Sequence, residues 1–356
     1  MKIDELFRSM AKHGASDLHL KVGQPPVFRI SGDLVRVKGE ALTDEDIRGL
    51  LLPAMSDKSK HELETRGYAD FGVPLEGVGR FRCNVFKQLG RLSASIRRNR
   101  PTIPTYAELK LPPSVARCAQ FEQGLVLMGG ITGSGKSTTI ASILDDINHR
   151  RRCHILTIED PVEFVYQDDK AIVNQREVGQ DVVSFEEALR SAVREDPDVM
   201  LLGEMRDAET FETALTAAET GHLVFGTIHA SGAAPTIGRL LDLFPTAKHA
   251  QIRTSLAFNL KAVLNQKLLP AADGKGMVPV VETMFISPII RKLILEGEDA
   301  KIGDAFIRDA ESGSEGFNKA LARLFFEKQI TQEAALATSP NPEELRMNLR
   351  GISFTS

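Results

Sequence analysis

The feature that most constrains this fold is a glycine-rich segment placed directly after a fully apolar run. Residues 124–129 read Gly-Leu-Val-Leu-Met-Gly, which is typical of a strand buried on both faces of a parallel sheet. The segment that follows fits the pattern G-x-x-x-x-G-K-[ST] in full: Gly130, Ile131, Thr132, Gly133, Ser134, Gly135, Lys136 and Ser137, with Thr138 next. A helix-like stretch, 137–149, comes after it. This order predicts a phosphate-binding loop, because a chance glycine-rich turn would need neither flanking element.

The residue types of this loop indicate nucleotide chemistry. Its glycines allow backbone N–H groups to face phosphate oxygens, and the following helix adds its positive N-terminal end. We expect Lys136 to reach the β- and γ-phosphates and the Ser137 hydroxyl to bind Mg²⁺. Kinases, GTPases, transporter subunits, helicases and motors all share such a loop. The N/T-K-x-D motif that reads guanine is not evident, which favours ATP over GTP.

Three further apolar runs end in residues with ionisable side chains. They are 155–158 before Glu159, 199–202 before Gly203 and Glu204, and 223–228 before His229. Ligands of open α/β sheets bind beyond the carboxyl ends of the strands, so Glu159, Glu204 and His229 are predicted to converge on the γ-phosphate. Gly203 stands where such a strand usually ends in aspartate. The two glutamates are therefore expected to share the holding of Mg²⁺ and the activation of water.

Each of these residues also has a simpler interpretation. A carboxylate after a strand is usually a helix cap or a surface charge, and the phosphate loop in the same sheet is what favours the functional reading. His222 and His229 flank the last of these strands. Either could bond to a phosphate oxygen or a catalytic water, and either could be an ordinary capping histidine.

The chain before the loop has a different pattern and predicts a second domain. An amphipathic helix at 3–12 is followed by short alternating strands, with more strands around 69–98. Prolines crowd the segment 99–113 and make it a poor helix and a poor central strand, so we interpret it as a linker. The predicted bounds are a small α+β domain at 1–98, this linker, and a doubly wound α/β core at 114–356 that is mostly helical from about 288.

Arginines gather in the strands before the linker and at its start. They are Arg80, Arg82, Arg91, Arg97, Arg98 and Arg100. A guanidinium matches two phosphate oxygens at once, so Arg82 and Arg97 are candidate nucleotide contacts that close over ATP as arginine fingers do. A solvated strand face and a nucleic-acid site are the alternatives.

Composition narrows the class of protein. The 356 residues are 42% hydrophobic and 26% charged, which argues against disorder. The net charge of −4 and the scarcity of aromatic residues among the arginines argue against a chain that binds nucleic acid. Three scattered cysteines do not suggest a disulfide framework. We find neither a signal core nor an apolar run long enough to span a membrane, so a cytoplasmic protein is expected.

Taken together, the motifs resemble those of the secretion and type IV pilus motor ATPases, and within them the PilT-like retraction ATPases. The similarity covers nearly the whole chain. Besides the loop, the similarity rests on four motifs, the last of which has two parts: 14–20 (GASDLHL), 158–164 (IEDPVEF), 203–207 (GEMRD), and 220–222 with 227–229 (TGH and TIH). They resemble the N-terminal signature, the Asp box, an atypical Walker B motif and the His box of that family.

The resemblance implies a PAS-like N-terminal domain, a linker and a RecA-like ATPase domain, assembled as a homohexamer with ATP near domain and subunit interfaces. It implies that Glu159 activates water and that Glu204 lies near Mg²⁺. His229 is implied near the nucleotide, and His222, which belongs to the same box, is a candidate nucleotide contact. Arg82 and Arg97 are similar to N-domain arginines that approach the phosphates.

Two features favour the retraction branch. The segment 266–275 has no cysteine, whereas extension ATPases usually carry a tetracysteine zinc element there. The helix 289–296 is similar to a C-terminal helix of the retraction ATPases, although Lys292 and Leu295 replace an Asn and an Arg. We therefore expect a motor for pilus depolymerisation that acts on a platform protein at the inner membrane. A paralogous accessory, secretion or DNA-uptake motor and a nucleic-acid translocase remain alternatives.

Overall fold

The computed structural model describes residues 2–30, 32–99 and 102–350. The chain forms two units. The first consists of 1–103, 160–166 and 176–184, and the second of 104–159, 167–175 and 185–356. Arg100 lies outside the described residues. The domain bounds drawn from the sequence are not the same as these units and stay a prediction.

Among the described residues, the first unit holds a six-stranded antiparallel sheet in the order β3-β2-β1-β6-β5-β4. Its strands are β1 (Asp17–Lys21), β2 (Val27–Ile30), β3 (Asp33–Arg36), β4 (Tyr68–Leu75), β5 (Gly79–Gln88) and β6 (Arg91–Arg98), and its helices are α1 (Ile3–Lys12), α2 (Asp44–Leu51) and α3 (Asp57–Arg66). Thr43 caps α2, since Asp46 N–H donates to Thr43 Oγ1 at 3.1 Å.

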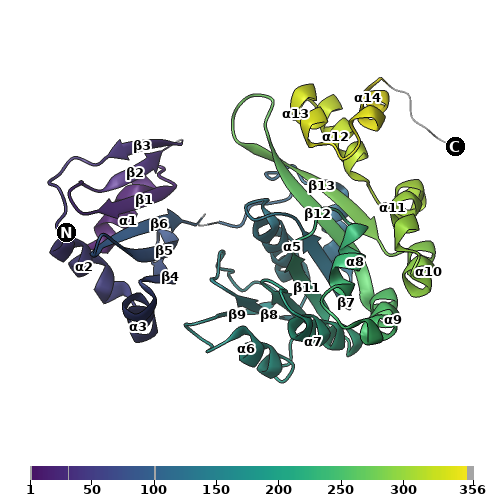
Figure 1. Ribbon diagram of the computed structural model, residues 1–356, viewed down its shortest axis with the longest axis horizontal. Coiled ribbons are helices and arrows are strands. Elements are labelled where there is room, and N and C mark those ends of the chain that lie inside the picture. Colours follow the sequence, from purple (N-terminus) through teal and green to yellow (C-terminus); the bar gives the residue numbers. More distant parts are fainter. Residues whose placement is uncertain (1, 31, 100–101, 351–356) are drawn as a thin grey trace. The chain divides into compact units, whose positions relative to one another are not determined.

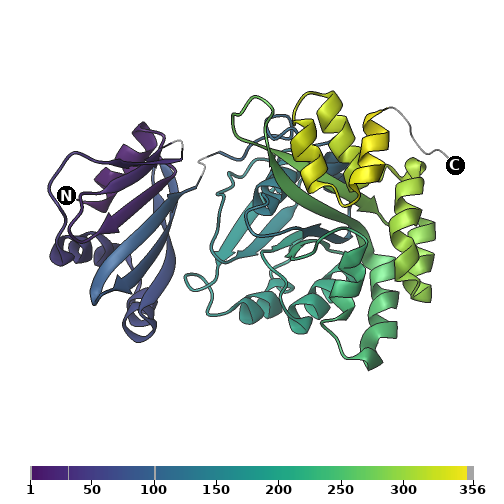
Figure 2. The ribbon, with the colours of Figure 1, turned by 45° about the horizontal axis from the view of Figure 1, so that its top comes forward.

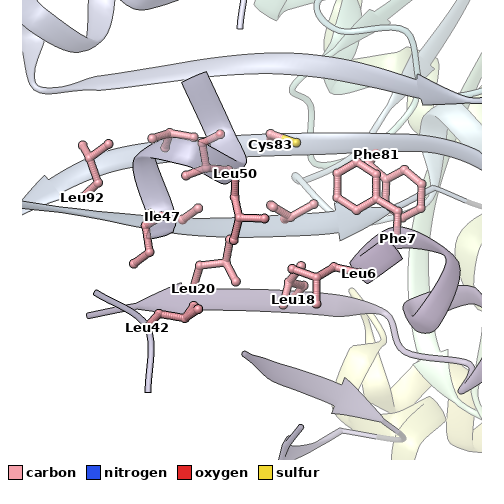
Figure 3. Close-up of a cluster of buried hydrophobic side chains, with 14 of the residues drawn as sticks. Leu6, Phe7, Leu18, Leu20, Leu42, Ile47, Leu50, Phe81, Cys83 and Leu92 are labelled. Carbon is pink, nitrogen blue, oxygen red and sulfur yellow. The ribbon is translucent and has the colours of Figure 1, made fainter. Parts of the chain in front are cut away.

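The core of the first unit lies between the helices and the sheet. Phe7 of α1 stacks on Phe81 of β5 with ring centroids 3.9 Å apart, and both side chains are fully buried. Leu18 and Leu20 alternate into the same core from β1, while Leu50 covers it from α2 (Figure 3). The alternation read from the sequence therefore becomes one packed face of the sheet.

Two segments from far along the chain belong to this first unit. Arg80 of β5 pairs with the buried carboxylate of Glu177, and the same carboxylate accepts the backbone N–H of Val162 at 3.0 Å. These contacts tie 160–166 and 176–184 to β5. No local feature of the sequence indicates this arrangement.

In the part of the chain that the structure describes, the second unit holds a seven-stranded sheet in the order β13-β12-β7-β11-β10-β8-β9. The strands are β7 (Gly124–Gly129), β8 (His154–Glu159), β9 (Ile172–Glu177), β10 (Val199–Leu202), β11 (Leu223–Ile228), β12 (Leu260–Pro270) and β13 (Met277–Phe285). The last two residues of β9, 176 and 177, are counted with the first unit. The run β12-β7-β11-β10-β8 is parallel, and every residue of β7, β10 and β11 is buried. The predicted buried strands are confirmed.

Helices pack against this sheet, and further helices follow its last strand towards the C-terminus (Figures 1 and 2). They are α4 (Pro113–Ala116), α5 (Lys136–Arg150), α6 (Phe185–Ala192), α7 (Ala208–Glu219), α8 (Pro235–Leu241), α9 (His249–Asn259), α10 (Pro288–Glu296), α11 (Asp299–Arg308), α12 (Phe317–Phe326), α13 (Gln332–Thr338) and α14 (Pro342–Leu349). The last three helices pack on the β12–β13 hairpin, where Phe317 and Leu321 meet Val280. The helical character predicted from about 288 is confirmed.

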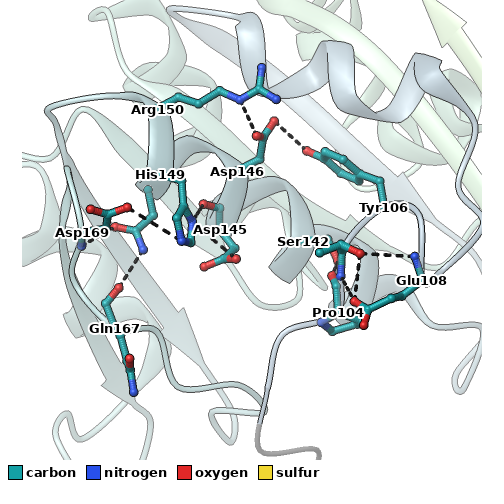
Figure 4. Close-up of polar contacts among 12 residues, drawn as sticks. Pro104, Tyr106, Glu108, Ser142, Asp145, Asp146, His149, Arg150, Gln167 and Asp169 are labelled. Carbon is teal, nitrogen blue, oxygen red and sulfur yellow. Dashed lines mark hydrogen bonds and ion pairs between the residues drawn. The ribbon is translucent and has the colours of Figure 1, made fainter.

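The C-terminal part of the proline-rich segment lies against α5 (Figure 4). The buried Ser142 hydroxyl donates to the carbonyl of Pro104 at 2.6 Å. The Tyr106 hydroxyl donates to Asp146 at 3.2 Å, and Asp146 also pairs with Arg150 at 2.5 Å. Burial and the nearby Asp146 carboxylate raise the pKa of Tyr106, so its hydroxyl stays protonated. This stretch is therefore held by side chains of the helix that follows the phosphate loop.

No helix in the described ranges is long and apolar enough to cross a membrane. Cys83, Cys118 and Cys153 form no disulfide within those same ranges.

Candidate functional site

The predicted loop connects β7 to α5, and its geometry suits an anion. Gly135 adopts φ of 85°, which brings the chain into the first turn of α5 at Lys136. No side chain among the described residues caps this N-terminus, so the first N–H groups of a 15-residue helix point towards the loop. The Lys136 ammonium donates to the carbonyls of Gly130 and Ile131 at 2.8 and 3.0 Å. The lysine is thus held within the loop itself.

Glu159 is the last residue of β8. Its Oε1 accepts a hydrogen bond from the buried Thr157 hydroxyl at 2.8 Å and another from Gln175 Nε2 at 3.4 Å. Thr157 lies two residues earlier on the same strand, so both side chains point to the same face of the sheet. These contacts give the carboxylate a defined direction at the end of the strand.

Glu204 follows β10, and its carboxylate contacts an arginine and a histidine. Its Oε2 accepts from Arg206 at 2.6 Å, and its Oε1 lies 2.9 Å from Nε2 of His229, the residue that follows β11. The Arg206 hydrogen bond, with further help from the charge of Arg206 and from His229, lowers the pKa of Glu204. Asp207 has a structural role, because it caps α7 by accepting from Thr210 N–H at 2.8 Å.

The parallel strands bring these groups to one edge of the sheet. In the strand order, β7 with its loop lies beside β11, then come β10 and β8, so the ends that carry Lys136, His229, Glu204 and Glu159 all face the same way. An open pocket of about 540 Å³ lies beside the loop at this edge. It is lined by Gly130, Ile131, His229, Ala230, Ser231, Pro235, Gly238, Arg239 and Asp242.

The residues present fit a magnesium ion that binds together with phosphates. Ser137 lies in the first turn of α5, and Glu204 supplies a carboxylate at the same edge of the sheet. Mg²⁺ prefers oxygen ligands and usually takes one or two from the protein and others from phosphate and water. Thr132, Gly133, Ser134 and Thr138 complete the loop and the start of α5.

Arg82 and Arg97 belong to the first unit. They are direct partners in the β5–β6 register, so they lie side by side on the sheet. Arg97 Nε donates to Asp17 Oδ1 at 2.9 Å, yet 72% of its side chain is exposed. Their contact with nucleotide stays a prediction.

His222 is not brought to the loop within this chain. It precedes β11, and its Nδ1 lies 2.9 Å from the carbonyl of Ala217 at the end of α7. His229 lies at the other end of the same strand, about 23 Å away for seven residue steps at a rise of about 3.3 Å. Within the single chain His222 therefore lies at the opposite edge of the sheet from the loop, because a strand places its two flanking residues at opposite edges. Its contact with nucleotide stays a prediction.

Sequence reasoning missed Gln266 of β12. Its side chain is almost fully buried and contacts both the loop and α5. The polar pair Asn265 and Gln266 inside an apolar run was the signal that could have found it.

Comparison with known proteins identifies the family. Residues 106–299 match the family described as type II/IV secretion system protein. The chain is 43% identical to the type IV pilus retraction ATPase PilT of Pseudomonas aeruginosa, over 96% of this chain and 99% of that protein. The chain belongs to this family and is a PilT-like ATPase. The resemblance predicted from the motifs is confirmed.

Two further comparisons support this assignment. The type IV pilus ATPase PilU of Pseudomonas aeruginosa is 37% identical over 98% of this chain and 92% of its own length. A crystal structure of the pilus retraction motor PilT with bound ADP superposes on this PilT-like ATPase with a TM-score of 0.90 at 45% identity, covering 97% of this chain and 99% of the other. The predicted fold class is confirmed by that superposition.

Proposed function

We propose that this PilT-like ATPase is a motor that hydrolyses ATP to ADP and phosphate with Mg²⁺ and uses the energy to retract type IV pili. One observation carries the proposal. A complete phosphate loop, two strand-end glutamates and a histidine lie at one edge of the sheet, in a chain similar over nearly its whole length to a pilus retraction ATPase.

The chemistry assigns a role to each group. Lys136 and the first N–H groups of α5 bind and orient the phosphates. Ser137 and Glu204 would hold Mg²⁺, which when bound neutralises phosphate charge. Glu159, directed by Thr157 and Gln175, orients or deprotonates the attacking water. His229, in contact with Glu204, is placed to respond to the γ-phosphate.

The assembly proposed from the family resemblance is a homohexamer. Arg82 and Arg97 would then contact phosphates, and hydrolysis around the ring would move one domain against the other. The partner is an inner-membrane platform protein of the pilus machine, and the motor would work from the cytoplasmic side. We propose no nucleic-acid partner, since the net charge is −4.

A second candidate is an accessory motor that works with a paralogous ATPase. Two observations favour it. The chain is 37% identical to PilU over nearly its whole length, and Lys292 and Leu295 of α10 depart from the helix pattern of the retraction ATPases. Both candidates share the same ATPase site.

Deletion of the gene in its host, with twitching and surface pili scored, tests the cellular role. Excess pili without twitching support a main retraction motor, and normal piliation with weakened twitching supports the accessory motor. Loss of pili contradicts both.

The purified protein should hydrolyse ATP only with Mg²⁺. Lys136→Ala should weaken nucleotide binding roughly 10- to 100-fold, as expected for loss of a charged hydrogen bond. ATP turnover that survives Lys136→Ala would contradict the assigned site. Turnover that requires DNA would contradict the assignment as a pilus motor.

A further inference from the structure

Gln266 connects the phosphate loop to the helix that follows it. Its Nε2 donates to the carbonyl of Ser134 at 2.7 Å, and its Oε1 accepts from the Thr139 hydroxyl at 2.8 Å. Gln266 and Thr139 are each about 1% exposed. The two contacts lie just before and just after the stretch that contains Lys136 and Ser137. One amide therefore sets the spacing between the last part of the loop and the first turn of α5.

The position of Gln266 follows from strand pairing. β12 runs parallel to β7, with Asn265 opposite Gly129, so Gln266 lies level with the start of the loop. A Cβ placed on Gly130 would lie 2.5 Å from the Gln266 carbonyl oxygen, and one on Gly135 would lie 2.8 Å from its Nε2. Two glycines of the loop are thus needed for close approach to this single residue.

The amide group matches its surroundings in a way that no other side chain of similar size does. It presents a donor to a carbonyl and an acceptor to a hydroxyl, both away from water. An apolar side chain would leave the Ser134 carbonyl and the Thr139 hydroxyl without these partners, and a carboxylate would place an acceptor against a carbonyl oxygen.

We propose that Gln266 is a positioning residue for nucleotide binding, which holds the loop and the first turn of α5 in the geometry that phosphates require. The inference rests on the proposed function, since it deepens the role of the same loop. Gln266 acts through Ser134 and Thr139 and does not itself contact phosphate. This amide pre-organises the loop. Replacement of Gln266 is therefore expected to lower the affinity for nucleotide more than it lowers the rate of hydrolysis.

The test measures nucleotide affinity and thermal stability separately on the full-length protein. ADP binding is titrated by calorimetry, and the unfolding temperature is recorded without nucleotide. Gln266→Met removes both hydrogen bonds and Gln266→Glu removes the one to Ser134, so each should weaken ADP binding at least about tenfold, the equivalent of one hydrogen bond or more. Thr139→Val should weaken it by a similar factor, and Thr139→Ser, which keeps the hydroxyl, should restore wild-type affinity.

Asn148→Asp provides the matched control. Asn148 is a fully buried amide on the same helix, and it contacts the carbonyl of Gln167 at 2.8 Å, away from the loop. The change should lower the unfolding temperature and leave ADP affinity within about twofold. The proposal is overturned if the Gln266 and Thr139 variants lose stability but bind ADP as tightly as the wild type. A wild-type protein that binds no ADP contradicts the proposed function instead, so the two failures are distinguishable.

Discussion

His229 Nε2 lies 2.9 Å from Oε1 of Glu204, across the ends of the neighbouring strands β11 and β10. The other oxygen of this carboxylate, Oε2, accepts a hydrogen bond from Arg206. Glu204 therefore joins the group proposed to hold Mg²⁺ to the histidine beside the loop. A change at the nucleotide that moves one of the two side chains must disturb the other.

Replacement of Glu204 by glutamine should abolish hydrolysis without abolishing binding. Glutamine keeps the size of the side chain but removes the charge proposed to hold Mg²⁺, so we expect kcat to fall at least about 100-fold. Phosphate release and ADP titration measure the two effects. Asp207→Asn serves as the control, because Asp207 caps α7. Wild-type turnover by the Glu204→Gln variant would rule out the metal role.

The acidic limb of the pH–rate profile should depend on Arg206. Its hydrogen bond is the largest cause that lowers the pKa of Glu204. Removal of Arg206 therefore raises that pKa, so the carboxylate becomes protonated at a higher pH than in the wild type. A protonated Glu204 no longer binds Mg²⁺. In Arg206→Ala the fall in kcat on acidification should begin at higher pH. Arg190→Ala removes a surface ion pair with Glu209 and should leave the profile unchanged.

The direction of the Glu159 side chain should depend on Thr157. Thr157→Val keeps the shape of this buried residue but removes the hydroxyl that donates to Glu159 at 2.8 Å. We expect kcat to fall roughly 3- to 10-fold, the effect of one hydrogen bond, with ADP affinity unchanged. Thr157→Ser should recover most of the rate. If the serine variant is as slow as the valine variant, packing and not the hydrogen bond is responsible.

The stacked pair Phe7 and Phe81 should dominate the stability of the first unit. Both rings are fully buried with centroids 3.9 Å apart, so Phe81→Ala opens a cavity and should lower the free energy of unfolding by about 3–5 kcal/mol. Urea titration followed by circular dichroism measures the loss. Leu89, which is 94% exposed, provides the comparison, and Leu89→Ala should change stability by less than about 0.5 kcal/mol.

Glu282 should make stability depend on pH. Burial raises the pKa of this β13 carboxyl, which accepts the N–H of Ala233 at 2.6 Å. The folded state then holds the proton more tightly than the unfolded chain, so stability falls as pH rises between the two pKa values. Glu282→Gln keeps an acceptor and does not ionise. Relative to the wild type, the stability of this variant should increase as pH rises above the ordinary pKa of glutamate, about 4.3, as measured by thermal unfolding. A constant difference as pH rises would contradict the assignment.

Much of the site could be predicted from the sequence because its parts are local. The loop from Gly130 to Ser137 carries its own turn residues, and each buried strand is a continuous apolar run that ends directly before Glu159, Glu204 or His229. In a parallel sheet these ends must share one edge, so convergence follows without knowledge of the strand order.

Other features depend on contacts between distant residues. Gln266 reaches the loop only because β12 pairs with β7, and nothing local to residues 260–270 specifies that partner or its register. Arg80 and Glu177 are also far apart in the sequence. Their ion pair helps to place part of the Asp-box segment in the first unit. His222 and His229 look equivalent beside one strand, but the strand separates them to opposite edges.

The sequence by itself determined the chemistry of this protein, namely a phosphate loop, strand-end carboxylates and the family they indicate. Only the tertiary structure decided which side chains hold that chemistry in place. The physical reason is that backbone turns and apolar runs act over a few neighbouring residues, whereas the partners of Gln266, Glu177 and Glu282 are selected by strand pairing and burial across the whole fold.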